Sequence, residues 1–173
     1  MATLAERMAR VALSMVAEPN DAATGRVLAL VRGVATMRLV VSDDMVLGLA
    51  RADVLIWRER LAARITPDLP DRVAETQGGE FGTLIPADKE WPARLDDLGE
   101  RAPYLLWTHG ATPFLTTALS DRVTITGSRA STPYGEHVTV ELATGMADEE
   151  RFVGGGAYGI EGAAHRTLLA AGG

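Results

Sequence analysis

The stretches VTITGSR (residues 123–129) and FVGGGAYG (residues 152–159) decide the fold of this chain. Each is an apolar run that ends in glycine and is followed by residues with helical spacing, which is the pattern of a strand, a tight loop and a helix. Such a loop leaves backbone N–H groups directed into an open crevice, and these groups bind phosphate well. The sequence therefore predicts two parallel strands whose carboxyl ends share an anion-binding site.

The last third of the chain repeats this strand, loop and helix order. A strand over residues 122–126 precedes a helix that Thr132 caps and Pro133 opens. A short strand over residues 151–153 precedes a second helix over residues 159–171. The order predicts one βαβ unit and a following helix, which is how a doubly wound sheet begins.

Residues 119–173 are therefore interpreted as the first βαβα part of a Rossmann-like domain. Two parallel strands leave both edges of the sheet open, so a stable domain of this class needs more strands. Gly172 and Gly173 stand where a third strand would follow. We expect a fragment that is truncated within the parallel-sheet domain.

Residues 1–66 are predicted to form a helical N-terminal domain, so the fold class is α/β, with an incomplete Rossmann-like parallel-sheet domain after the helices. Three helices are expected, the first from Thr3 to Pro19, the second over residues 21–32 with Gly33 closing it, and the third from a cap at Ser42 or Asp43 to Pro67. The third carries arginines on its outer face (Arg51, Arg58, Arg60 and Arg64). Acidic residues interleave with them, which favours a solvated face over a nucleic-acid patch.

Residues 67–118 are predicted to be a linker followed by lead-in strands. The first part is rich in proline and glycine, the composition of turns. Short strands are expected over residues 82–85 and 104–108.

Composition limits the function classes. The chain has 173 residues, a net charge of −6 and no cysteine, and its three histidines lie 28 residues apart. These features exclude a disulfide framework, a thiolate metal site and a protein that coats nucleic acid with its whole surface. No run of apolar residues is long enough for a membrane span, and the cytosol is the default compartment.

The candidate site consists of the two glycine loops and the aromatic residues beside them. Arg129 can hold a phosphate with both ends of its guanidinium, and Ser128 can add a hydroxyl donor. Tyr134 and Tyr158 could stack on bases or simply pack against the helix starts, and both readings stay open. His165 is expected to pack against the sheet by a hydrogen bond. The predicted phosphate-binding residues are Gly127, Ser128, Arg129, Tyr134, Gly155, Gly156 and Gly159.

A dinucleotide site is the first alternative, because Gly154, Gly156 and Gly159 form a literal GxGxxG. The acidic residue expected about twenty positions further on would lie past residue 173, and a whole βα unit precedes the motif, whereas the fingerprint usually opens the fold. The first loop lacks the Lys-Ser/Thr pair of a P-loop. No nucleotide cofactor is expected.

The same stretches closely resemble the DNA-processing protein A (DprA/Smf) family, especially its high-GC Gram-positive members. The resemblance rests on ITGSR (125–129), TPYG (132–135), GGAYGIEGAAHR (155–166) and AAGG (170–173), and upstream on IP (85–86), WP (91–92), LDDL (95–98) and PYLLW (103–107). This sequence departs from the family pattern at Gly154, where Ser is usual, and at Glu161, where Asp is usual.

The resemblance implies a single-stranded-DNA-binding protein that protects incoming DNA and passes it to the RecA recombinase in natural transformation. It implies no catalysis, no cofactor, no membrane contact and a homodimer in full-length relatives. By position, residues 127–129 would be the DNA-contacting loop, and Gly155, Gly156 and Gly159 would shape its neighbour.

The alternative is an enzyme. The LOG-type phosphoribohydrolases, which cleave the N-glycosidic bond of a nucleoside monophosphate, share a strand that leads to a GS loop and a GGG-x-x-G loop. Their catalytic PGGxGTxxE motif would fall after residue 173. The long sequence before residue 119 disfavours them, because they begin almost directly with the GS strand.

Overall fold

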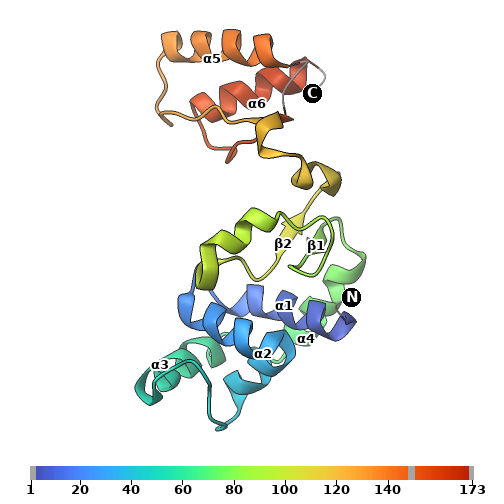
Figure 1. Ribbon diagram of the computed structural model, residues 1–173, viewed down its shortest axis with the longest axis vertical. Helices are drawn as coiled ribbons and strands as arrows, with labels where there is room; N and C mark the ends of the chain where they lie inside the picture. The colour runs from blue at the N-terminus through green and yellow to red at the C-terminus, as the bar shows by residue number, and fades with distance from the viewer. Residues whose placement is uncertain (1–2, 148–150, 172–173) are drawn as a thin grey trace. The chain divides into compact units, whose positions relative to one another are not determined.

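The computed structural model describes residues 3–147 and 151–171. The chain divides into two compact units, Met1–Thr116 and Thr117–Gly173, hereafter the N-terminal and C-terminal units (Figure 1). The predicted class, α/β with a helical N-terminal part, is confirmed. Gly172 and Gly173, where the sequence predicts that a third strand would follow, lie outside the described residues. Within those ranges, no helix has the length and apolar character needed to cross a bilayer.

The first helix, α1 (Leu4–Val16), begins directly after the predicted cap and ends shortly before Pro19. Thr3 caps it, because its side-chain oxygen accepts a hydrogen bond of 3.2 Å from the Glu6 N–H. Val11 and Val16 are fully buried on its inner face. The Glu6 side chain does not return the hydrogen bond to the cap, and points to the next helix instead.

The first part of the second helix, α2 (Ala22–Val41), ends at Arg32 and Gly33 as the sequence predicts, but a second helical segment that the sequence did not predict follows it and runs to Val41. The helix breaks at Arg32, which has φ 65° and ψ 176°, and then restarts. The Glu6 carboxylate caps the restart, since it accepts hydrogen bonds from the Gly33 N–H at 2.9 and 3.0 Å and from the Val34 N–H at 3.4 Å. A side chain of another helix thus acts as the N-cap.

The third helix, α3 (Arg51–Ala62), begins later than the predicted cap at Ser42 or Asp43. The residues before it form turns, in which Gly48 has φ 86°. Leu47, which lies in one of these turns, is 59% exposed. A glycine in the left-handed region interrupts the helical path back to the predicted cap.

The inner face of α3 carries apolar residues at helical spacing. Val54, Trp57 and Leu61 are buried in the core of the N-terminal unit. The Trp57 indole donates a hydrogen bond of 2.9 Å to the hydroxyl oxygen of Thr24 on α2. This bond satisfies the one polar group of a large buried side chain.

Three of the four arginines on the outer face of this region bind their own chain. Arg58 donates to the carbonyl oxygens of Leu39 and Asp44, Arg60 pairs with the Asp21 carboxylate, and Arg64 pairs with the Glu18 carboxylate. A face whose cations are paired in this way favours the solvated reading over a nucleic-acid patch.

The segment predicted as a linker packs into the N-terminal unit. It contains the helix α4 (Leu69–Glu75), whose Leu69 and Val73 are buried together with Val11 of α1. Pro70 explains the difference, because a proline in the first turn of a helix has no N–H that needs a partner. A residue that reads as a helix breaker here opens a helix.

The N-terminal unit also contains a two-stranded antiparallel sheet. Strand β1 (Gly82–Leu84) pairs with β2 (Leu106–Thr108), and both lie within the ranges expected for the lead-in strands. Short 3-10 helices complete the chain before the second sheet: η1 (Thr76–Gly78), η2 (Ala93–Arg101), η3 (Thr112–Thr116) and η4 (Leu119–Asp121).

The C-terminal unit has the predicted strand and helix order. It comprises β3 (Arg122–Val123), α5 (Pro133–Met146), β4 (Arg151–Phe152) and α6 (Ile160–Ala170). The predicted parallel pairing of β3 with β4 is confirmed, although each strand is only two residues long. Thr132 caps α5 as predicted, since its hydroxyl oxygen accepts a hydrogen bond of 3.1 Å from the Gly135 N–H. Helices α5 and α6 pack against each other, with Ala143, Ala163 and Ala164 buried.

We expect the Glu6→Gln variant to be less stable than the parent by about 2–4 kcal/mol at pH 7. The Glu6 carboxylate is 8% exposed and also accepts a hydrogen bond of 2.8 Å from the Arg10 guanidinium, so the neutral amide leaves a nearly buried cation without its counter-charge. Urea denaturation followed by circular dichroism measures the change. Glu18→Gln is the control, because Glu18 forms an exposed pair with Arg64 and should cost less than about 1 kcal/mol.

The free energy of unfolding that Glu6 contributes should decrease as the pH falls. Burial opposes ionisation of this carboxyl, but the Gly33 N–H, Arg10 and the Val34 N–H outweigh it, so the pKa of Glu6 lies below its ordinary value. A carboxyl of lowered pKa stabilises the fold above its unfolded pKa and loses that effect as the pH falls through its folded pKa. The difference between parent and Glu6→Gln should shrink below about pH 5. A difference that stayed constant down to pH 3 would contradict this role.

Arg32→Gly should stabilise the chain by about 1 kcal/mol. The φ and ψ of Arg32 fall in a region that is almost restricted to glycine, so the substitution removes backbone strain. Arg38→Gly, an exposed position of regular helix in the same α2, should destabilise by about the same amount. Thermal melts of the two variants should therefore shift in opposite directions, and equal shifts would show that Arg32 is not strained.

Candidate anion-binding site

The two glycine loops meet at the same end of the β3–β4 sheet. The Ile160 N–H, at the start of α6, donates a hydrogen bond of 3.2 Å to the Ser128 carbonyl oxygen. A Cβ atom on Gly159 would lie 2.2 Å from that oxygen and 2.6 Å from the Arg129 carbonyl oxygen. Gly159 also has φ 75°, so both its conformation and its surroundings require glycine.

The other loop glycines differ in what surrounds them. Gly127 lies against Ile160, since a Cβ at residue 127 would come within 2.8 Å of that side chain. Gly156 has φ 69° and open space around it. The predicted loop residues are thus brought together by packing of the first loop on the first residue of α6.

Arg129 is exposed. Within residues 3–147 and 151–171, its guanidinium forms no hydrogen bond or ion pair. The hydroxyl of Ser128 donates to the Ala130 carbonyl oxygen at 3.0 Å. In this structure Ser128 donates its proton inside the loop, and its role as a donor to a ligand stays a prediction.

The second loop already holds an anion that belongs to this chain. The Glu161 carboxylate accepts a hydrogen bond of 3.2 Å from the Ala157 N–H and one of 2.9 Å from the Thr126 hydroxyl. The Thr126 hydroxyl, followed by the Ala157 and Gly155 N–H groups, keeps the pKa of Glu161 below its ordinary value. Sequence reasoning did not assign this role, although an acidic residue in the first turn of a helix is a known signal for contact with backbone N–H groups.

The aromatic residues beside the loops are open to solvent. Tyr134 is 77% exposed at the start of α5, and Tyr158 is 87% exposed just before α6. Exposure of this degree favours the reading in which the rings are available to stack. Both rings are free to stack on a planar ligand.

His165 contacts a ring, where the sequence led us to expect a hydrogen bond. It meets Phe152 edge to face, with 4.8 Å between the ring centres. Its Nε2 atom is buried and has no hydrogen-bond partner within the described part of the chain. A Cβ on Gly154 would lie 2.8 Å from this nitrogen, so the small residue at 154 makes room for the imidazole.

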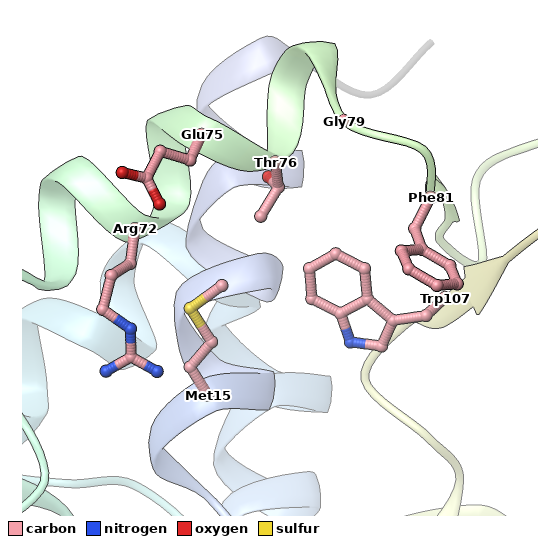
Figure 2. Close-up of a pocket in the computed structure, with 7 residues that line it drawn as sticks. All are labelled: Met15, Arg72, Glu75, Thr76, Gly79, Phe81 and Trp107. Carbon is pink, nitrogen blue, oxygen red and sulfur yellow. The ribbon is translucent and has the colours of Figure 1, made fainter.

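The N-terminal unit has a separate shallow cavity of about 320 Å³. Figure 2 shows the rings of Trp107 and Phe81 on one side of it, the Arg72 side chain on the other, and Met15 of α1 between them. Its lining residues are far apart in the sequence, which explains why sequence patterns did not single it out. None of the glycine-loop residues lines it.

The comparisons with known proteins agree with the resemblance seen in the sequence. The family model of DNA recombination-mediator protein A matches residues 82–173. Two curated proteins from strains of Mycobacterium tuberculosis, both named as DNA processing protein DprA, are 41% identical to this chain over 105 residues, which is 54% of this chain and 26% of each relative. The chain thus spans about a quarter of the length of these curated relatives. Neither is a phosphoribohydrolase.

A solved structure shows the same fold. The X-ray structure of DNA processing protein A (DprA) from Streptococcus pneumoniae superimposes with a TM-score of 0.62 at 22% identity, over 100% of this chain and 56% of that protein. The family model alone covers more than half of this sequence, including both glycine loops. The chain belongs to the DNA recombination-mediator protein A family.

Proposed function

We propose that the glycine loops of the C-terminal unit bind the phosphates of single-stranded DNA. The observation that carries this proposal is the Arg129 guanidinium, exposed and without a partner in the described residues, on a loop that the Ile160 N–H and the Gly159 backbone hold in place. Guanidinium groups bind phosphate with two parallel hydrogen bonds, and a packed loop loses little conformational entropy on binding. The site is therefore suited to one or two phosphates.

The exposed tyrosines favour a single strand over a duplex. Tyr134 is exposed in the first turn of α5 and Tyr158 is exposed in the second loop just before α6, and unpaired bases stack readily on such rings. The net charge of −6 repels DNA from most of the surface and confines binding to a focused site. Recognition through phosphate and stacking does not depend on base sequence.

The wider role that we propose follows the family. The description of the family as a recombination mediator favours binding over catalysis. In a longer relative, this site would belong to a protein that protects incoming single-stranded DNA and delivers it to the RecA recombinase in natural transformation. A homodimer of such a full-length protein and a cytoplasmic location, where the recombinase acts, are parts of the same proposal.

Arg129→Glu should weaken binding of single-stranded DNA by about tenfold or more. The loss should be equal for all base sequences, and log Kobs should depend less steeply on log salt, by about 0.7 per phosphate contact removed. Fluorescence anisotropy with labelled oligonucleotides across a salt series measures both quantities. Arg94→Glu makes the same charge change on a side chain that is 73% exposed in the N-terminal unit, and should leave binding nearly unchanged. If both variants bound alike, the loop would not be the site.

Gly159→Ala should weaken binding although it removes no charged group. The added Cβ would overlap the Ser128 and Arg129 carbonyl oxygens, so the loops must move apart. Gly145→Ala is the matched control, because that glycine lies in α5 with open space around it and alanine favours a helix. Retention of full binding by Gly159→Ala, at an unchanged melting temperature, would rule out convergence of the two loops on one strand.

A further inference from the structure

We propose that Glu161 acts as an internal competitor that occupies the phosphate position of the second glycine loop, so that Arg129 and its own loop carry the contact with DNA in this chain. This inference rests on the proposed function. It adds that the two loops are not equivalent. The first is open to a ligand, and the second is closed by an anionic side chain of the same chain.

The contacts of Glu161 are those that a bound phosphate oxygen would make. One carboxylate oxygen accepts the Ala157 N–H at 3.2 Å, and the other accepts the Thr126 hydroxyl at 2.9 Å. A Cβ on Gly155 would come within 3.0 Å of the first oxygen, so the glycine there lets the carboxylate approach the loop backbone. Both strand-end loops contribute donors to this one carboxylate, since Thr126 comes from the first and Ala157 from the second.

A phosphate cannot share this position with the carboxylate. An N–H that is directed at one acceptor is not available to another, and two negative charges a few ångströms apart repel each other. DNA must therefore either displace the Glu161 side chain or leave the second loop unused. Removal of the side chain should open a second phosphate position next to the one at Arg129.

We expect Glu161→Ala to bind single-stranded DNA about tenfold more tightly than the parent chain, the gain that one charge-assisted contact provides. The dependence of log Kobs on log salt should become steeper by about 0.7, because one more phosphate is neutralised. Glu161→Gln, which keeps the shape but not the charge, should lie between the two. Glu141→Gln removes the same charge from a side chain that is 67% exposed on α5, and serves as the control for a general charge effect.

The DNA affinities of these variants test whether Glu161 competes with phosphate. Tighter binding and a steeper salt dependence for Glu161→Ala, without the same change for Glu141→Gln, support it. Unchanged or weaker binding by a variant that melts like the parent overturns it, as does an equal gain in both variants. If Glu161→Ala does not fold, Glu161→Gln against Glu141→Gln gives the same test.

A second measurement separates this inference from the proposed function. Inorganic pyrophosphate is titrated into the ¹⁵N-labelled full chain, and the amide signals of Gly155 and Ala157 are followed by NMR. Shifts in Glu161→Ala but not in the parent support the inference even if no variant binds DNA. Equal shifts in parent and variant, or none in either, overturn it even if Arg129 proves essential for DNA binding.

Discussion

The C-terminal unit depends on one close approach, that of the Gly159 backbone to the carbonyl oxygen of Ser128. The approach leaves no room for a side chain, and it is closed by the hydrogen bond from the next N–H, that of Ile160. Because each strand is only two residues long, the sheet by itself cannot fix the positions of its loops. The contact between the loops does so, and it places an exposed guanidinium beside a backbone segment that can hold negative charge.

Two carboxylates play the same physical role in different units. Glu6 binds the N–H groups at the restart of α2, and Glu161 binds those of the second glycine loop. In each case hydrogen bonds and a neighbouring polar or charged group keep the pKa below its ordinary value. The comparison shows that a glycine with exposed N–H groups is not by itself a ligand site. A nearby acidic side chain can satisfy these groups first, and whether it does so decides if the loop is structural or open to a ligand.

Much of the C-terminal unit could be predicted because its signals are local. The Thr132-Pro133 start of α5 is a contiguous pattern, and parallel topology alone brings two strand-end loops together.

The errors in the sequence-based predictions arose where the deciding partner is distant in sequence or where a residue type has two structural roles. Glu6 lies 27 residues before the N–H that it caps, so no local pattern showed that α2 restarts. Pro70 has the same letter whether it ends a helix or opens one, and the linker prediction failed there. The contact of Glu161 with Thr126 likewise joins residues that are distant in sequence, so no local pattern predicted it.

The interior of the C-terminal unit is made of small side chains, and this has a thermodynamic consequence. Its buried residues in the described ranges are Thr139, Ala143, Ala163 and Ala164, whereas the N-terminal unit buries tryptophan, leucine and valine. Since the free energy gained on burial scales with apolar area, the alanine interface between α5 and α6 contributes little. An anion that binds only the folded loops adds to the free energy of unfolding of this unit. The addition is a large fraction of the total where burial itself contributes little. Anion binding and folding of the C-terminal unit are then thermodynamically coupled.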